Sequence, residues 1–280
     1  MKTDITVIIL TKNEEANIER CINSVKGWGE RVVVLDSGST DRTIELAEYL
    51  GAEVYNHEPF ENHGKQFNWA LDNLQIKTNW VFRIDADEVV PTDLAEEIIQ
   101  KCQLHSTDDV NAFEMRFKVF FLDRFLKYGG AYPFCKINIF KYSKARFNER
   151  PLGDNVELKE GQYIQLQCDC LHYDFKSLSA FVRKHDWYAD LEVCSYYRQL
   201  DSIDANISKA AKIRKAIRNN VYYKLPRYLR AKFYYWYILY CRLGFLDGEA
   251  GYVYAFIKSY FYRFLVDAKI YEQELLNKKK

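Results

Sequence analysis

Strand-like and helix-like segments alternate over the first hundred residues, and this alternation limits the fold more than any other feature of the sequence. Residues 5–10 and 80–84 are short apolar runs rich in β-branched or aromatic side chains, which are typical of buried strands. Residues 15–25 instead carry apolar side chains at helical spacing. The expected strands are 5–10, 31–35, 52–55 and 80–84, and the expected helices are 15–25, 42–50, 64–74 and 91–102. Such an order predicts a parallel sheet covered by helices on both faces.

Polar residues follow three of these strands at the point where each strand ends. They form the segments 11–14, 36–41 and 85–88. Parallel strands in such sheets bind ligands beyond their carboxyl ends, so we expect these three loops to meet at one edge.

The loops fit a metal-bound phosphate better than a dinucleotide. Thr11-Lys12-Asn13-Glu14 contains no glycine, which excludes the Gly-x-Gly-x-x-Gly turn of a dinucleotide site, and no phosphate-binding P-loop is present. Asp85 and Asp87 have the spacing that directs two carboxylates toward one Mg²⁺ or Mn²⁺ ion. Ordinary turn or cap chemistry remains the alternative for these acids and for Asp36.

The order of the three loops resembles that of the family 2 glycosyltransferases. The first strand ends in Thr-Lys-Asn-Glu, the second in Leu-Asp-Ser-Gly-Ser-Thr-Asp and the fourth in Ile-Asp-Ala-Asp-Glu, and the resemblance covers residues 4–100 closely. It implies an α/β GT-A fold with a mostly parallel central sheet. The expected catalytic domain is 1–176, with a nucleotide-sugar half at 1–100 and an acceptor half at 101–176, and a helical region follows at 177–280.

The resemblance also implies roles for individual residues. Asp36 would read the base, Asp85 would lie near the ribose and diphosphate, and Asp87 would hold a divalent metal, Mn²⁺ or Mg²⁺. His172 is a candidate contact of the metal or the substrate. The residues implied in nucleotide-sugar binding are Thr11, Asn13, Glu14, Asp36, Lys65, Gln66, Asp85 and Ala86.

Four motifs together resemble one branch of the family, the lipopolysaccharide core β-1,4-glucosyltransferases. They are LDSGSTDRT, IDADE, LHYDF at 171–175 and RLGFLDGEAGYVYA at 242–255. Two departures are visible. Phe67 stands where the branch commonly has arginine, with Lys65 as a possible compensation, and Pro151-Leu152-Gly153-Asp154-Asn155 stands where it often has an acid–histidine segment.

The catalytic base has to come from the acceptor half, on the side of the reacting carbon away from the metal. Aligning residues 151–155 with the family's Met-Asp-Glu-His segment places Asp154 on the catalytic acid, and Glu157 is the reserve. Asp123 and Asp174 are further acids in this region. The alternative for Asp154 is that it only holds its own loop.

The acceptor half also contains strand-like segments at 112–122, 136–141 and 163–166. Between the first two, Tyr128 and Tyr132 lie in a glycine-rich loop and suit stacking on sugar faces. Two half-buried structural tyrosines are the alternative.

Charge and aromatic content point to a membrane surface near the end of the chain. The whole chain has 40 basic and 39 acidic residues, a formal charge of +1, and shows no motif for nucleic-acid binding. The segment 209–232, however, has nine basic residues and no acid, and aromatic segments at 233–240 and 252–264 follow it. This combination favours an anionic membrane interface, with a solvated helix face as the alternative.

From the sequence we expect neither a membrane-spanning helix nor a secretory signal. Its longest apolar run, 233–241, has nine residues, whereas a span needs about 20. The seven cysteines are an odd number, and without a signal segment we expect reduced thiols. The expected location is the cytoplasm, peripherally attached to the cytoplasmic face of the inner membrane.

These features together predict an inverting, metal-dependent glycosyltransferase. It would move a sugar from a nucleotide donor, with a UDP-linked hexose expected, to a lipid-linked or cell-surface glycan such as lipopolysaccharide core or a polyprenyl-linked oligosaccharide. A sugar nucleotidyltransferase is the alternative enzyme, although the glycine-rich basic loop after strand one is missing. A non-catalytic glycan- or membrane-binding protein is the non-enzymatic alternative.

Overall fold

The computed structural model describes residues 3–149, 156–173, 176–198 and 222–278. The chain forms two compact units. The first comprises residues 1–119 and 133–174, and the second comprises residues 120–132 and 175–280. The segment 120–132, which the sequence places in the acceptor half, groups with the helical residues.

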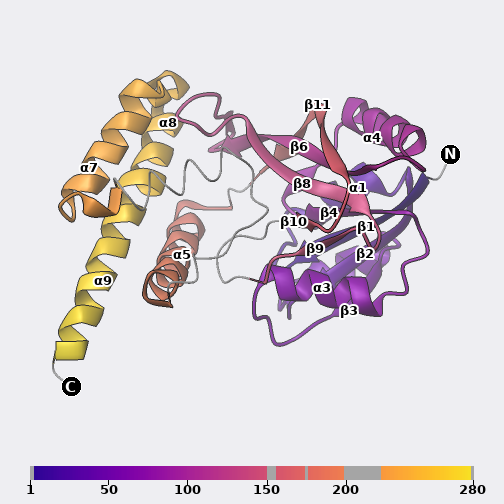
Figure 1. The fold of residues 1–280 in the computed structure, drawn as a ribbon, viewed down its shortest axis with the longest axis horizontal. Helices are drawn as coiled ribbons and strands as arrows, with labels where there is room; N and C mark the ends of the chain where they lie inside the picture. The colour runs from indigo at the N-terminus through magenta and orange to yellow at the C-terminus, as the bar shows by residue number, and fades with distance from the viewer. Residues whose placement is uncertain (1–2, 150–155, 174–175, 199–221, 279–280) are drawn as a thin grey trace. The chain divides into compact units, whose positions relative to one another are not determined.

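The first unit begins with four parallel strands whose order along the sheet is β3-β2-β1-β4 (Figure 1). These strands are β1 (Thr3–Thr11), β2 (Gly29–Asp36), β3 (Glu53–Asn56) and β4 (Trp80–Asp85). The intervening helices are α1 (Ile18–Val25), α2 (Thr43–Tyr49) and α3 (His63–Asn73), and α4 (Thr92–Leu104) follows the short strand β5 (Glu88–Val89). The alternation read from the sequence is therefore confirmed.

Helices cover both faces of this sheet, as an unbroken apolar strand requires. Ile5, Val7 and Ile9 of β1 pack in a core with α1 and α4. Ile8 and Leu10, which point to the other face, pack in a second core with α3. Neither core leaves β1 a solvent face, and Thr6, the polar side chain inside the apolar run, is buried and hydrogen-bonded to Thr78.

The rest of the sheet is mixed. The full order is β3-β2-β1-β4-β8-β6-β11-β5, and β8 runs antiparallel to both of its neighbours. The added strands are β6 (Val110–Phe121), β8 (Phe134–Lys141) and β11 (Gln162–His172). β11 is parallel to β6 and antiparallel to β5. Its neighbour β5 directly follows the Asp85–Asp87 turn, so the sheet returns to that turn from a distant part of the chain.

Several boundaries differ from those read on the sequence. The first helix begins at Ile18 instead of residue 15, because the backbone N–H groups of Asn17 and Ile18 both donate to the Glu14 carbonyl and form a turn there. The strand expected at 163–166 extends to His172, with a register shift between Gln165 and Asp169. The unforeseen strands are short: β5, β7 (Arg124–Phe125), β9 (Ala145–Phe147) and β10 (Val156–Leu158).

The described residues of the second unit are mostly helical, apart from the loop segment that includes β7. Its α-helices are α5 (Leu178–Arg198), α7 (Leu229–Trp236), α8 (Gly248–Ala255) and α9 (Tyr262–Lys278). π-Helical turns at Tyr237–Cys241 and Phe256–Phe261 extend α7 and join α8 to α9. Phe121, Phe181 and Tyr254 meet in its core. Of the helices that the structure describes, none is both long enough and apolar enough to span a bilayer.

Candidate active site

Hydrogen bonds join the loops that follow β1 and β2. The Asn13 N–H donates to Ser39 Oγ at 2.8 Å, and the Thr40 N–H donates to Asn13 Oδ1 at 2.8 Å. The Glu14 N–H donates to Thr43 Oγ1 at 2.7 Å. Asn13 has a φ of 55°, a left-handed conformation that asparagine tolerates better than most residues. Two of the three predicted polar loops therefore form one connected edge.

Asp36 lies at the centre of this edge and is completely buried. Its Oδ1 accepts from Thr11 Oγ1 at 2.9 Å and from Ser39 Oγ at 2.6 Å. Its Oδ2 accepts from the N–H groups of Gly38 and Ser39 at 2.8 and 2.7 Å. Both carboxylate oxygens thus hold the loop, and a nucleobase would have to replace one of these bonds to contact Asp36 directly. Base reading by Asp36 stays a prediction.

Helix α3 adds Gln66 to the same edge but turns Lys65 away from it. The Gln66 side chain is buried and its Nε2 donates to Ser37 Oγ at 2.5 Å. Lys65 is exposed and forms an ion pair with Glu61, one helical turn earlier. The structure therefore gives no contact between Lys65 and the acidic residues after β4.

Asp85 ends β4 between two cations. Arg83 Nη2 lies 2.9 Å from Asp85 Oδ1, and Lys136 Nζ lies 3.6 Å from Asp85 Oδ2. Burial alone would raise the pKa of Asp85. The charges of Arg83 and Lys136, with smaller contributions from His63 and His172, outweigh burial and hold the pKa well below its ordinary value. Asp85 is therefore a stable anion.

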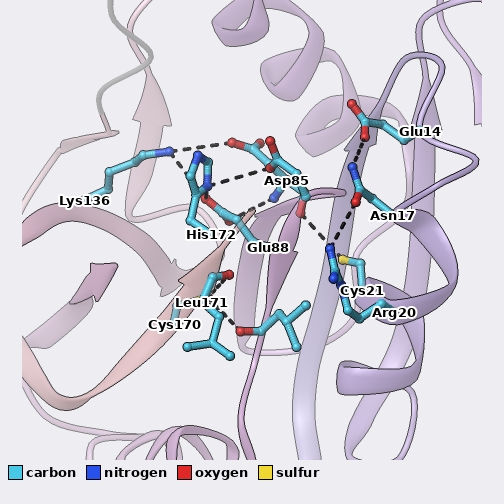
Figure 2. A network of polar contacts seen from close by, with 12 residues as sticks. Glu14, Asn17, Arg20, Cys21, Asp85, Glu88, Lys136, Cys170, Leu171 and His172 are labelled. Carbon is cyan, nitrogen blue, oxygen red and sulfur yellow. Dashed lines mark hydrogen bonds and ion pairs between the residues drawn. The ribbon is translucent and has the colours of Figure 1, made fainter. Parts of the chain in front are cut away.

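Glu88 and His172 meet because β11 returns beside β5. The two residues are opposite each other in that antiparallel pair, and the Tyr173 N–H donates to the Asp87 carbonyl at 2.8 Å. His172 Nδ1 lies 3.4 Å from Glu88 Oε1 and 3.8 Å from Asp87 Oδ1. Glu88 is fully buried, and its Oε2 accepts from the Asp85 N–H at 3.0 Å. Figure 2 shows Lys136 and His172 directed toward Asp85 and Glu88.

A second arm reaches this cluster from α1. Asn17 Nδ2 donates to Glu14 Oε2 at 2.8 Å, and Arg20 Nη2 donates to Asn17 Oδ1 at 3.0 Å (Figure 2). The Arg20 guanidinium lies 3.9 Å from the centre of the Tyr173 ring. This arm ties the loop after β1 to the residues that follow β11.

The negative charge of the cluster affects Cys21, which also lies on α1. Burial raises the pKa of the Cys21 thiol well above its ordinary value, and the carboxylates of Glu88, Asp87 and Asp85 raise it further. Cys21 is therefore held as a neutral thiol and serves packing rather than chemistry.

Asp87 and His172 lie within the distance that two ligands of one divalent cation can have. Two atoms that are each about 2.1 Å from a Mg²⁺ ion lie at most about 4.2 Å apart, and Asp87 Oδ1 and His172 Nδ1 satisfy this at 3.8 Å. Among the described residues, no three His, Cys, Asp or Glu side chains are grouped so as to hold an ion alone. Such an ion would need further ligands from water and substrate phosphates, which is the usual arrangement for Mg²⁺.

The structure does not bring every predicted residue to this cluster. Glu157 lies on β10, is exposed, and accepts from Asn148 Nδ2 at 3.0 Å. Ala86 is buried, and its N–H donates to the Leu10 carbonyl at 3.3 Å. Asp154 and Asp174 lie outside the described residues. Asp123 is exposed in the second unit.

Sequence reasoning missed four basic residues of the site. Arg83 precedes Asp85 by two positions, so strand alternation places both side chains on one face; a charged residue inside a buried strand was the available signal. His63 was assigned no role, yet its charge contributes to the low pKa of Asp85. Lys136 and Arg20 are single basic residues whose sequence context carries no signal.

The family model for glycosyl transferase family 2 matches residues 6–153 of this chain. A Rickettsia bellii protein named as an uncharacterized glycosyltransferase is 45% identical over 94 residues, which is 34% of this chain and 31% of that protein. Matches to related Rickettsia proteins are similarly partial, so the chain spans about a third of the length of these relatives.

Two further similarities differ in extent. The lipopolysaccharide core biosynthesis glycosyltransferase LpsC of Rhizobium meliloti is 25% identical over 281 residues, covering 98% of this chain and 94% of that protein. The crystal structure of glucosyl-3-phosphoglycerate synthase from Mycobacterium tuberculosis, in complex with Mn²⁺, UDP and glucosyl-3-phosphoglycerate, is 26% identical with a TM-score of 0.35. That match covers 41% of this chain and 44% of the other.

Proposed function

The chain belongs to glycosyl transferase family 2 and has a GT-A fold, and from this premise we propose the reaction, its metal, its donor and its acceptor. The reaction is transfer of a sugar with inversion from a nucleotide sugar, a UDP-linked hexose, to a glycan acceptor. A divalent ion, Mn²⁺ or Mg²⁺, takes part.

One observation carries the proposal: His172 lies beside Asp87 and Glu88, although 84 positions separate His172 from Glu88 in the chain. If the acids after β4 only formed a turn or a helix cap, they would need no histidine from a distant strand. A distant imidazole, a buried carboxylate and two cations around the same turn instead suit a site for an ion and a diphosphate. Asp87 and His172 would hold the ion. When bound, it supplies positive charge that stabilises the leaving diphosphate.

The donor is proposed to bind along the connected edge of β1 and β2. The loops of Asn13 and Glu14 with Asp36 form its wall, and Gln66 completes it from α3. Asp85 would lie toward the ribose and diphosphate. Lys65 forms an ion pair with Glu61. We therefore propose that Lys65 contacts the donor only when the donor breaks this ion pair. In this proposal residues 1–100 bind the donor and residues 101–176 the acceptor.

The chemical step is a single in-line displacement. An acceptor hydroxyl oxygen attacks the anomeric carbon, the bond from that carbon to the diphosphate oxygen breaks with its electron pair leaving on the diphosphate, and a carboxylate takes the hydroxyl proton. We propose Asp154 as this base, with Glu157 as the reserve. The position of Glu157, exposed on β10 and bonded to Asn148, supports its lower rank.

The acceptor is proposed to be a lipid-linked or cell-surface glycan of the lipopolysaccharide core class. The similarity to LpsC along nearly the whole chain supports this class, because it includes the helical region as well as the donor half. A lipid-linked acceptor would place the protein at the cytoplasmic face of the inner membrane as a peripheral protein.

The test is loss of metal-dependent donor binding. In wild-type protein, UDP with Mn²⁺ should raise the melting temperature, by an amount equivalent to about 2.7 kcal/mol when UDP is at 100 times its dissociation constant. Asp87→Ala should lose this effect and the transfer of sugar from a nucleotide donor. Asp72→Ala, which removes an exposed carboxylate on α3, is the matched control and should keep both. Metal-dependent turnover near wild type in Asp87→Ala would refute the assignment.

The base is tested separately, because it should not affect donor binding. Asp154→Asn should bind UDP and Mn²⁺ normally but lose about 10²–10⁴-fold in turnover, the usual contribution of general base catalysis. A nearly normal Asp154→Asn enzyme beside an inactive Glu157→Gln would move the role to Glu157.

A further inference from the structure

The second unit carries a group of large apolar side chains that are exposed instead of packed. Phe233 is 60% exposed and Trp236 is 56% exposed, and both are on α7. Soluble proteins rarely expose a contiguous apolar patch of this kind without a partner for it. We call this surface the aromatic face, and its members are Phe233, Trp236, Tyr237 and Tyr240.

The aromatic face follows the helix period. Phe233, Trp236, Tyr237 and Tyr240 are spaced three, one and three residues apart, so they form one stripe along α7 and the π-helical turn after it. Ala231 and Leu239, which point elsewhere, are buried. The helix therefore already has a core-facing side, and the exposed stripe is a second apolar side.

A second stripe lies on the neighbouring helix. Tyr252, Phe256, Tyr260 and Phe264 are four residues apart, and their rings contact each other from Phe256 to Phe264. The Tyr235 ring contacts this second stripe, with centroids 6.1 Å from Phe256 and 6.2 Å from Tyr260. Tyr235 lies on the same side of α7 as the buried Leu239, so the second stripe packs against the side of α7 that faces away from Phe233 and Trp236.

The charge around the aromatic face is mostly positive. Between residues 224 and 264 four basic side chains are exposed, and Glu249 is the one exposed acid. The exposed basic residues are Lys224, Lys232, Arg242 and Lys258.

We propose that the aromatic face docks on an anionic lipid surface. Trp and Tyr, which have an apolar ring and a polar group, are the residues that settle at the headgroup level of a bilayer, and basic residues beside them add attraction to anionic lipids. A second copy of this chain would bring the same positive charges against each other, which opposes pairing through this face. The inference rests on the peripheral membrane location proposed above and names the surface that makes the contact. Vesicle binding and donor binding are measured separately, so either can fail without the other.

The experiment uses the full chain with vesicles of phosphatidylglycerol and phosphatidylethanolamine, some with brominated acyl chains. Trp236 should be quenched by the brominated lipid, and Trp236→Phe should remove this quenching while binding continues. The change Trp187→Phe removes the other markedly exposed tryptophan, 40% exposed on α5, and should leave the quenching in place. Phosphatidylcholine vesicles or added salt should weaken binding, because the basic residues then lose their attraction.

A double variant tests the surface itself. Phe233→Ser with Trp236→Ser should lower the vesicle partition coefficient about tenfold or more. Tyr49→Ser is the matched control, because Tyr49 is 87% exposed on α2 of the first unit, and its variant should bind like wild type. All variants should keep the UDP and Mn²⁺ thermal shift, which checks folding and donor binding.

Two kinds of result would overturn the inference. One is equal quenching in wild type and Trp236→Phe, or equal vesicle binding by the double variant. The other is a dimer in sedimentation equilibrium that the double variant abolishes while wild type ignores vesicles, which would assign the face to a second copy of the chain.

Discussion

Asp247 is expected to hold the glycine-rich loop that contains Tyr128 and Gly129. This carboxylate belongs to the motif at 242–255 and is 4% exposed. It accepts from the backbone N–H groups of Tyr128 at 2.9 Å and Lys127 at 3.2 Å. The Gly129 N–H also donates to the Arg242 carbonyl at 2.9 Å. The motif therefore fixes three successive residues of a loop that lies more than a hundred positions earlier.

The expected loss of loop stability follows from the two hydrogen bonds that the Asp247 carboxylate accepts. A hydrogen bond to a charged group contributes about 1.5–3 kcal/mol, and a buried donor left without an acceptor costs about 1–3 kcal/mol. Both amides are only partly buried, so water will recover part of the loss. We expect Asp247→Ala to destabilise the closed loop by about 2–4 kcal/mol. Asp247→Asn, which keeps one acceptor oxygen, should cost about half of that.

Amide hydrogen exchange measures the stability of the closed loop locally, because loop opening exposes particular N–H groups. Since 1.4 kcal/mol corresponds to a factor of ten, exchange at Lys127 and Tyr128 should accelerate about 30- to 1,000-fold in Asp247→Ala. Glu249→Ala removes an exposed acid two residues later on α8 and should leave both amides unchanged. Wild-type protection of the two amides in Asp247→Ala would refute the reasoning. If that variant unfolds as a whole, Asp247→Asn still decides the question, because it keeps the shape of the side chain.

Two other predictions concern buried groups. The Arg230–Asp267 ion pair has side chains only 4% and 1% exposed, so Asp267→Ala should lower the free energy of unfolding by about 3–5 kcal/mol in urea denaturation. Arg230→Met combined with Asp267→Leu should cost clearly less, and an equal or larger loss in the double variant would contradict this account. Iodoacetamide at pH 8 should label the exposed Cys194 and Cys241 of the folded protein but not Cys21, whose pKa is raised by burial and by nearby carboxylates. Peptide mapping that finds Cys21 labelled as fast as Cys194 would show that the cluster is more open than described.

The sequence predicted the parallel part of the sheet well because its signals are local. Residues 5–10 and 80–84 are apolar in every or nearly every position, and the structure buries both strands on both faces. The polar residues that follow them have no alternative to the carboxyl edge of the sheet, since the core excludes them. The edge formed by Asn13, Asp36 and Gln66 was therefore foreseeable in outline.

Details of bonding at that edge were not foreseeable. The sequence suggests that Asp36 is available to a base, whereas its two oxygens already accept four bonds from Thr11, Gly38 and Ser39. Likewise, Lys65 pairs with Glu61. Which partner a polar side chain takes depends on distances of a few tenths of an ångström, and these follow from the backbone path of the loop.

By itself, then, the sequence determined the alternating sheet, the family and the acids that end β4, because strand period, turn residues and motif order are properties of neighbouring positions. Only the tertiary structure decided what surrounds those acids. The antiparallel pairing of β5 with β11 sets His172 against Glu88, and the antiparallel strand β8 delivers Lys136 to Asp85. Strand pairing between distant segments is fixed by how the whole sheet buries its two faces, and no single segment carries that information.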